Sequence, residues 1–194
     1  MKKKLFTFSN LFTAIFIIFI LAMLINPGFK ATVLQGFMKI GLFQPNIPKS
    51  APGKSSEVVT QSLLFKNTDG KVIDLQEQRG KVIFINFWAT WCPPCIAEMP
   101  SVNKLYNEFK NNENVIFIIA DVDNNSIKST AFMKEKKFSL PVYSLAGDIP
   151  REYFSGTLPT TIILDKSGNI AFQHEGLADY SSAKMVEYIK KMSE

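Results

Sequence analysis

The sequence predicts an α/β fold in which a mixed β-sheet is flanked by helices on both faces. Two nearly continuous apolar runs of strand length, residues 81–88 and 115–120, are typical of strands buried on both sides of a sheet. Helical patterns alternate with these runs, as in a connected α/β domain. The chain has 194 residues, 46% of them hydrophobic, so it is long enough for one sizeable core and too short for two ordinary domains.

The first element is an apolar segment that is long enough to cross a membrane. Residues 5–25 carry no charge and follow the lysines Lys2 to Lys4. A span needs about 20 apolar residues, and lysines before a first span usually stay in the cytoplasm. A cleavable signal peptide has the same polarity, but residues 25–28 contain no clear small-x-small site. We therefore expect residues 1–25 to form a cytoplasmic tip and one uncleaved transmembrane helix, with the remainder exported.

Residues 26–56 are expected to be a tether between this anchor and the globular part. Prolines and glycines recur along the segment, and no strong hydrophobic period is present. Its middle is either an irregular spacer or a short amphipathic helix lying on the outer membrane surface. Such a helix would present six apolar side chains, namely Val33, Leu34, Phe37, Met38, Ile40 and Phe43.

Residues 57–194 form the predicted globular domain, in which strands and helices alternate. Besides the two apolar strands, the expected elements are a hairpin at 61–75, helices at 93–110 and 126–136, a hairpin at 160–174, and a closing helix capped by Asp179 and ending near Met192. Residues 138–157 give no clear pattern.

The charged residues are distributed unevenly along the chain. Residues 1–56 hold seven lysines and no acid, whereas residues 57–194 hold 15 basic and 17 acidic residues. The net charge of +5 therefore arises at the front of the chain, and the globular domain is slightly acidic. A nucleic-acid partner is not supported, because such a partner needs a basic surface on the globular domain.

The candidate reactive centre is the pair Cys92 and Cys95, the only two cysteines. A disulfide that encloses two residues restricts the unfolded chain very little, so this spacing favours a bond that opens and closes. Zinc is disfavoured, because a zinc site needs three or four protein ligands and His174 is the only histidine. We expect no metal and no cofactor beyond the redox-active cysteine pair.

The local sequence predicts different roles for the two cysteines. Cys92 follows a buried strand and falls at or next to the N-cap of the next helix, where the helix dipole favours a thiolate. Cys92 is therefore the expected attacking sulfur, and Cys95, inside the first turn, the resolving one. Pro93 and Pro94 fit this first turn, whose amides have no helical partner. Because Pro94 lacks an amide hydrogen, the Cys95 amide is the expected donor to the Cys92 sulfur.

The sequence resembles the thioredoxin superfamily, specifically its membrane-anchored TlpA/ResA-type branch. The resemblance covers about residues 57–194 and rests on the segment FWATWCPPC, with Pro100 five positions after the second cysteine. It implies a thioredoxin-like fold with an added N-terminal β-hairpin. Pro100 matches a helix-kinking proline, and the alternative is a helix that ends at Met99. Pro159 matches a cis-proline that lies opposite the cysteines and, with Leu158 beside it, offers backbone to an extended substrate.

Two polar residues near the cysteines are candidates for proton transfer. Glu98 lies three residues after Cys95 on the same helical face and matches a buried acid of ResA-like proteins. A buried carboxyl group keeps its proton to higher pH and can exchange it with the resolving thiol. The alternative is a solvated glutamate. Asn86 occupies the strand position where thioredoxins carry an acid, and an amide cannot titrate, so Glu98 or water would serve Cys95.

The remaining aromatic and acidic residues near the motif have simpler interpretations. Trp88 continues the strand alternation and is expected in the core, whereas Trp91 adjoins Cys92 and is the expected contact for partner proteins. Asp121 and Asp123 follow a strand and are expected in a polar loop and helix cap rather than a metal site. His174 is expected at a strand end without a catalytic role.

The resemblance implies an exported thiol:disulfide oxidoreductase that reduces disulfides in client proteins, with cytochrome maturation factors among its possible clients. It would be a single-pass protein of the bacterial cytoplasmic membrane, with the catalytic domain on the extracytoplasmic side and a membrane electron donor. Two alternatives are a Sco-like copper-delivery protein and a peroxidase. Sco-type proteins separate their cysteines by three residues, here two, and residues 89–92 lack the T-x-x-C pattern of peroxiredoxins.

Overall fold

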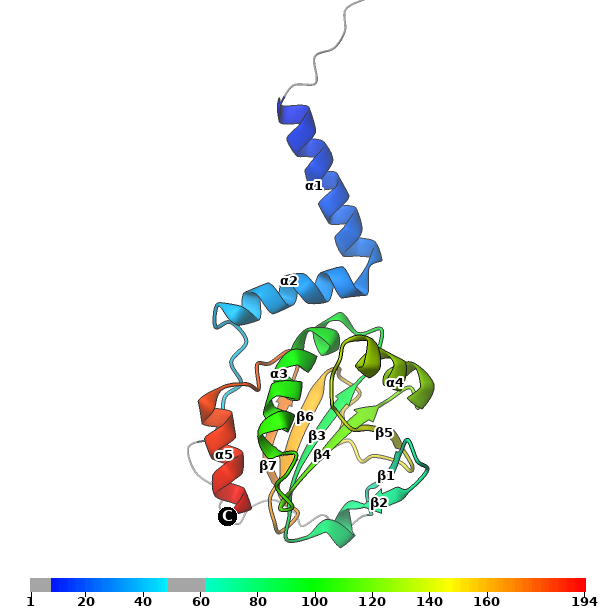
Figure 1. Ribbon diagram of the computed structural model, residues 1–194, viewed down its shortest axis with the longest axis vertical. Coiled ribbons are helices and arrows are strands. Elements are labelled where there is room, and N and C mark those ends of the chain that lie inside the picture. Colours follow the sequence, from blue (N-terminus) through cyan, green and yellow to red (C-terminus); the bar gives the residue numbers. More distant parts are fainter. Residues whose placement is uncertain (1–7, 49–61) are drawn as a thin grey trace, which may run out of the picture.

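The computed structural model describes residues 8–48 and 62–194 (Figure 1). Two helices, α1 (Phe8–Ile25) and α2 (Pro27–Lys39), precede the globular part. Within these described residues no single helix has the length and hydropathy of a membrane span, whereas α1 and α2 have them jointly, across a bend of 105°. The predicted tip at Lys2 to Lys4, the first residues of the predicted anchor and the predicted domain start at residue 57 lie outside the described residues.

A seven-stranded mixed sheet forms the centre of the globular part. Its strands are β1 (Leu64–Asn67), β2 (Val72–Asp74), β3 (Val82–Trp88), β4 (Val115–Asp121), β5 (Val142–Leu145), β6 (Thr160–Leu164) and β7 (Ile170–Glu175). Their order across the sheet is β2-β1-β5-β4-β3-β6-β7. The central strands β3, β4 and β5 are parallel, and the other neighbours pair antiparallel. The two apolar runs of the sequence are therefore the central strands β3 and β4, as predicted.

Side-chain alternation along the central strands divides the core into two clusters. Phe84 and Trp88 of β3 face one side, where buried residues of α3 (Pro93–Phe109), α4 (Ser126–Glu135) and α5 (Ala183–Ser193) pack on the sheet. Ile85 and Phe87 face the other side, which is covered by the β5–β6 connection and by Leu75 of the 3-10 helix η1 (Leu75–Gln78).

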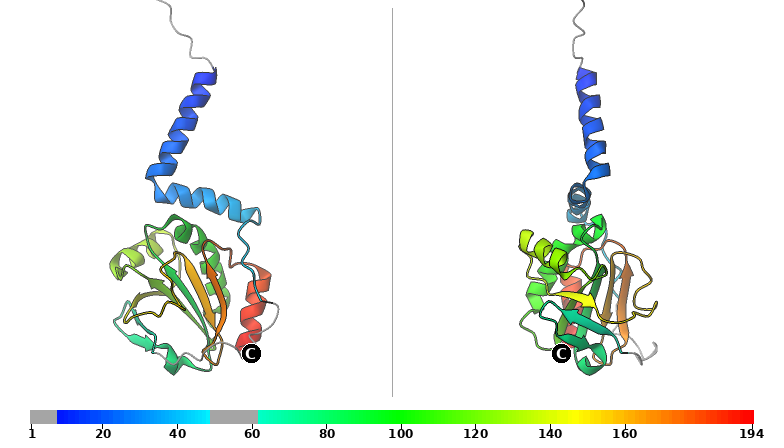
Figure 2. Two further views of the ribbon diagram at one scale, coloured as in Figure 1. Left: turned by 180° about the vertical axis from the view of Figure 1, so that it is seen from behind. Right: turned by 90° about the vertical axis from the view of Figure 1, so that its right-hand side faces the viewer.

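The expectation of helices on both faces is therefore met only in part. The β3-α3-β4 and β4-α4-β5 units advance across the sheet in the same direction, and crossovers of one hand then place both helices on the same face. Figure 2 shows this arrangement from behind and from the side. The opposite face is covered mainly by irregular chain, in which Tyr153 is buried and Phe154 stacks on Phe87 at 4.7 Å between ring centroids.

Helix boundaries agree with the sequence at α3 and α4 and differ at α5. α3 continues through Pro100 to Phe109, so the alternative end at Met99 is wrong. The N-cap of α5 is Ser182, whose hydroxyl accepts a hydrogen bond from the Met185 amide, and not Asp179. Asp179 instead accepts from the Ser181 amide at 2.9 Å, which closes a turn before the helix begins.

The segment that the sequence suggested as a tether lies against the globular part over its described length. α2 begins at Pro27, six residues before the amphipathic segment suggested by the sequence, and it packs on α3 through Ala31 and Met38. Beyond α2, the Phe43 carbonyl accepts a hydrogen bond from the Asp179 amide at 2.9 Å, and Ile47 packs on the core. Residues 27–48 are thus the helix α2 followed by irregular chain, and both are held on the domain surface.

Candidate active site

The cysteine pair lies where β3 leads into α3. Cys92 and Cys95 form a disulfide, and Cys92 is the N-cap of α3 with extended backbone dihedrals, as predicted. Its carbonyl accepts the first helical hydrogen bond, from the Ile96 amide at 3.0 Å. Both cysteines are largely buried, with relative exposures of 3% for Cys92 and 0% for Cys95. The deeper position of Cys95 is the one expected of a sulfur that acts second.

The two prolines leave a single amide for the sulfur of Cys92. Pro93 and Pro94 occupy the first two positions of α3 and carry no amide hydrogen. The Cys95 amide donates to Cys92 Sγ at 3.3 Å, which confirms the predicted donor. In a reduced protein this amide and the positive end of the helix dipole would both favour a thiolate at Cys92.

Glu98 is a fully buried acid one helical turn after the cysteines. Its relative exposure is 0%, so the alternative of a solvated glutamate is wrong. Glu98 Oε1 accepts from Asn86 Nδ2 at 2.7 Å, and Oε2 accepts from the Ala178 amide at 3.3 Å. Burial raises the pKa of Glu98 from 4.5 to about 8, although these two hydrogen bonds oppose the shift. Glu98 therefore holds a proton at neutral pH and releases it in a mildly alkaline range.

Asn86 connects this acid to the neighbouring strand β6. Asn86 Nδ2 donates to Thr161 Oγ1 at 2.9 Å as well as to Glu98, while the buried Asn86 Oδ1 has no hydrogen-bond partner among the residues that the structure describes. Burial and the nearby Glu98 carboxylate raise the pKa of Tyr180 well above its ordinary value. The sequence pointed to Asn86 and Glu98, whereas Thr161, Ala178 and Tyr180 join them only through the fold.

Pro159 lies at the start of β6, the strand next to β3. The Leu158–Pro159 peptide bond is cis, as the resemblance implied. Thr160, which follows it, pairs with Phe87 at the end of β3 from which the cysteine loop emerges. Leu158 is half-buried and packs on both core clusters. The cis-proline segment and the cysteine loop therefore lie at the same end of the sheet.

Trp91 is the exposed side chain of the cysteine loop, whereas Trp88 is completely buried. Trp91 is 58% exposed, and its Nε1 donates to Asp123 Oδ2 at 2.7 Å. Asp123 belongs to the loop between β4 and α4, where Asp121 accepts hydrogen bonds from the Asp123 and Asn125 amides. Asp123 thus lies in a polar loop, as predicted, and orients Trp91, whereas Asp121 ends β4 and the N-cap of α4 is Asn125, so the predicted aspartate cap is wrong.

Comparison with known proteins places this arrangement in a family. The family model described as Redoxin matches residues 47–187. A thiol-disulfide oxidoreductase ResA of Bacillus cereus is 33% identical over 164 residues, which cover 83% of this chain and 91% of that protein. This chain belongs to the redoxin family and to the ResA-type branch of the thioredoxin superfamily.

Solved structures support the fold of this redoxin. The crystal structure of StoA from Bacillus subtilis has a TM-score of 0.54 and 26% identity, and the match covers 71% of this chain and 99% of that chain. A thioredoxin-family thiol:disulfide interchange protein from Chlorobium tepidum has a TM-score of 0.57 at 22% identity, covering 73% and 100%. The Redoxin match includes every candidate site residue from Asn86 to Pro159.

Residues 8–48 and 62–194 of this redoxin contain no group of three or more His, Cys, Asp or Glu side chains arranged to hold a metal ion. His174 lies on β7 opposite Thr161 of β6, and its ring stacks on Phe172 at 6.4 Å between centroids. The position of His174 on the strand agrees with the sequence prediction.

Proposed function

We propose that this redoxin is an exported, membrane-tethered thiol:disulfide oxidoreductase that reduces disulfides in client proteins. The observation that carries the proposal is the Cys92–Cys95 disulfide at the N-terminus of α3, one helical turn from the buried acid Glu98. A disulfide that closes so small a loop contributes little to stability, so its value lies in exchange. The relative named thiol-disulfide oxidoreductase ResA supports the same activity.

The proposed reaction transfers two electrons from the cysteine pair to a client disulfide. The Cys92 thiolate attacks one client sulfur, which forms a mixed disulfide and releases the other client sulfur as a thiolate. Cys95 then attacks Cys92 Sγ, releases the second client thiol and closes the Cys92–Cys95 disulfide. The client gains two electrons and two protons, and the enzyme loses the same. Trp91, Leu158 and the Pro159 backbone are the proposed contacts for the client segment.

Glu98 is the proposed partner for proton exchange with Cys95, and its ionised form, a minority at neutral pH, is the form that accepts the thiol proton. Before Cys95 can attack it must lose its proton, and its burial makes direct transfer to bulk water slow. A carboxyl group with a pKa of about 8 is matched to a thiol, whose ordinary pKa is about 8.5. Asn86 takes part as a positioning residue, because its amide holds Glu98 Oε1 at 2.7 Å.

The cellular role follows from the resemblance and from the front of the chain. The apolar helix α1 after the lysines Lys2 to Lys4 supports a single-pass anchor in the bacterial cytoplasmic membrane, with the domain on the extracytoplasmic side. A reductant in that compartment needs a membrane electron donor to restore its dithiol. Cytochrome maturation factors are proposed clients through the likeness to TlpA/ResA-type proteins.

The test is a redox titration of the full chain in detergent, combined with an insulin reduction assay. A reductant should have a reduction potential near about −270 mV, as thioredoxin does, and the dithiol form should reduce insulin disulfides. The Cys92→Ser variant is the control for cysteine-independent reduction. A potential near about −120 mV would indicate an oxidant and contradict the proposed direction. Absence of any exchange by the dithiol form would contradict the proposed activity itself.

A further inference from the structure

We propose that the elbow between α1 and α2 and the docking of α2 on α3 hold the cysteine end of the domain at the membrane surface. The partners of this redoxin would then be proteins that present their cysteines at that surface. This inference rests on the proposed function, because it takes α1 as the anchor and Cys92–Cys95 as the exchanging pair. Beyond the proposed function, the inference specifies which end of the domain faces the lipid.

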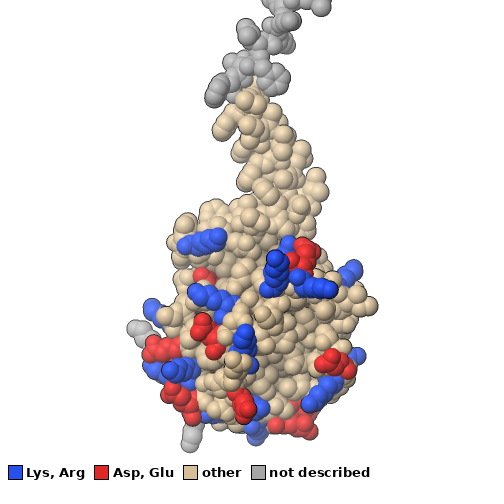
Figure 3. Space-filling model, viewed as in Figure 1, with Lys and Arg blue, Asp and Glu red and all other residues tan. Residues whose placement is uncertain are grey.

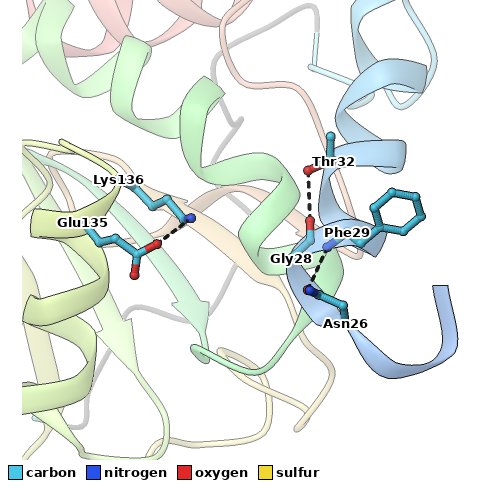
Figure 4. A network of polar contacts seen from close by, with 6 residues as sticks. All are labelled: Asn26, Gly28, Phe29, Thr32, Glu135 and Lys136. Carbon is cyan, nitrogen blue, oxygen red and sulfur yellow. Dashed lines mark hydrogen bonds and ion pairs between the residues drawn. The ribbon is translucent and has the colours of Figure 1, made fainter. Parts of the chain in front are cut away.

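The elbow is a defined joint, because specific contacts hold it. Asn26 is the N-cap of α2, and its Oδ1 accepts from the Phe29 amide at 3.1 Å (Figure 4). Thr32 Oγ1 donates to the Gly28 carbonyl at 3.0 Å within the same turn. The Phe29 ring also meets the Phe19 ring of α1 edge to face, with 5.5 Å between centroids. Capping and ring contact together fix the 105° bend between the helices.

This bend places α2 close to the membrane plane when α1 lies along the membrane normal. The exposed surface of α2 and of the turn after it presents four large apolar side chains, Phe37 of α2 and Ile40, Leu42 and Phe43 beyond it, which are between 42% and 74% exposed. Figure 3 shows the charged side chains gathered mainly on the globular part, whereas α1 shows none on this face. α2 carries two lysines, Lys30 and Lys39, and no acid. A helix with such a surface is suited to lie in the interface of a bilayer.

The inner side of α2 packs on the first turns of α3. Ala31 is 1% exposed and Met38 is 6% exposed, and both pack with Ile96 and Ala97. Ile96 directly follows Cys95 in the sequence. Two small side chains, Ala31 and Ala97, let the helices approach closely at this contact. Docked α2 therefore adjoins the turn that carries the cysteines.

A polar contact gives this docking a specific register. Pro100 has no amide hydrogen, so the Ile96 carbonyl, which such an amide would bond, has no helical donor. Gln35 Nε2 of α2 lies 3.5 Å from this carbonyl, as a long hydrogen bond. The proline kink thus exposes an acceptor on α3, and α2 supplies the donor. This pairing favours one position of α2 along α3.

The domain is consequently held with a defined end toward α2. The start of α3 and the preceding cysteine loop lie at the end of the domain next to α2, whereas the β6–β7 turn lies at the opposite end (Figures 1 and 2). With α2 on the bilayer, Trp91 and the cysteines lie near the headgroups and Ser167 of the β6–β7 turn lies far from them. A client disulfide close to the lipid surface would then be within reach of Cys92, and a client disulfide far above that surface would not.

The first experiment compares two disulfide probes on the reduced full chain in nanodiscs of phosphatidylcholine and phosphatidylglycerol. One probe is an aromatic disulfide carried on a phosphatidylethanolamine headgroup, and the other is the same disulfide free in water. Cys92 releases the chromophoric thiolate from either probe, and Cys95 then displaces the remaining thiol. The undocked variant is Ala31→Gln/Met38→Gln. The control, Gly36→Gln, changes an exposed position of α2 away from the elbow contacts, where a side chain has open space.

The undocked variant should lose preference for the lipid-borne probe by roughly tenfold, while its rate with the soluble probe stays within about twofold of the wild type. Co-localisation on the membrane is common to both chains, so only orientation differs. The control should keep the preference. An unchanged preference of the undocked variant for the lipid-borne probe would overturn the inference. If the undocked variant instead reacted faster than the wild type with both probes to the same extent, α2 would shield the cysteines rather than orient them, and this result would also overturn the inference. Failure of the wild type with both probes would instead overturn the proposed function.

A second experiment requires no undocked variant. Spin-labelled headgroup lipids quench tryptophans near the surface, and the buried Trp88 is common to all chains compared. Trp91 in the wild type should be quenched at least about threefold more than a tryptophan at the exposed Ser167, introduced as Ser167→Trp in a Trp91→Phe chain. Equal quenching of the two positions, or stronger quenching at position 167, would overturn the proposed orientation.

Discussion

The helices α3 and α4 both follow parallel strands of the sheet, yet their first turns are built from different chemistry. α4 begins with oxygen acceptors. Asn125 Oδ1 accepts from the Lys128 amide at 3.1 Å, and the buried Asp121 carboxylate accepts from the Asn125 amide and from Ser129 Oγ. α3 begins with a sulfur, Cys92 Sγ, that accepts from one amide at 3.3 Å.

The two buried acids near these turns differ in the same way. Asp121 accepts three hydrogen bonds, from two amides and one hydroxyl, at 2.6 to 3.1 Å. Glu98 accepts two, and burial outweighs them, so its pKa rises to about 8. The turn at the start of α4 supplies hydrogen-bond donors to its buried carboxylate and serves a structural role. The turn at the start of α3 has a weak sulfur acceptor, Cys92 Sγ, and a desolvated acid, Glu98. Disulfide exchange and proton transfer require this arrangement.

The largest effect that tests this contrast is expected at the cysteines. Cys92→Ser and Cys95→Ser should each lower client reduction by at least about a thousandfold, as loss of a nucleophile does in other enzymes. Only Cys95→Ser should accumulate covalent adducts in cells, because Cys92 still attacks and nothing releases the client. The adducts are counted on non-reducing gels and identified by mass spectrometry. Equal trapping by the two variants would mean that the attacking and resolving roles are assigned wrongly.

The next effect concerns Glu98. Its folded-state pKa of about 8 lies above the ordinary value of 4.5, so the folded state favours the protonated acid. The free energy of unfolding should therefore fall as pH rises from about 4.5 to 8, by roughly 3 to 5 kcal/mol. Glu98→Gln should remove this dependence and slow exchange by about tenfold or more near neutral pH. Denaturant titrations and rate measurements across pH check both.

The matched control for Glu98→Gln is Glu108→Gln, at an exposed position of the same helix. This variant should keep the pH dependence of both stability and exchange. If Glu98→Gln kept the wild-type rate profile while losing the stability dependence, the acid would be buried without serving Cys95.

A smaller effect compares the two N-caps directly. Asn125→Ala should lower the free energy of unfolding by about 1 kcal/mol, because an oxygen cap is lost, and leave exchange unchanged. In the reduced protein, Cys92→Ser should raise stability by up to about 1 kcal/mol, because an oxygen replaces a poor acceptor. The control Thr130→Ala changes an exposed position of α4. A loss of stability in Cys92→Ser would contradict the view that this cap is retained for reactivity.

Those parts of the fold that depend on local pattern could be predicted from the sequence. The continuous apolar runs identified β3 and β4, and the prolines with Cys92 identified the start of α3. β5 was missed because its pattern is mixed, with Val142 and Ser144 buried and its pairing supplied by β4. The cap of α5 was misplaced because Asp179 and Ser182 are both capping residues, and only the turn at Ser181 distinguishes them.

Those parts of the site that depend on distant segments could not be predicted. Helical register placed Glu98 beside Cys95, but its burial depends on Ala178, which lies 80 positions away in the sequence. The docking of α2 was missed because its buried residues, Ala31 and Met38, have no meaning without the facing surface of α3. The same holds for Asp123, whose contact with Trp91 exists only because β3 and β4 are neighbours.

That contact joins the two helix starts and supports the smallest of the predicted effects. Trp91 Nε1 donates to Asp123 Oδ2 at 2.7 Å, so the loop before α4 orients the exposed ring next to Cys92. A hydrogen bond of this kind contributes about 0.5 to 1.5 kcal/mol, and its exposure argues for the lower end. Asp123→Ala should therefore raise the KM for a protein client by about two- to threefold without changing kcat. Asp123→Asn retains an acceptor and should behave nearly as the wild type. An unchanged KM in Asp123→Ala would mean that the loop before α4 does not contribute to client recognition. A lowered kcat would show that the orientation of Trp91 also affects the geometry of the cysteine turn.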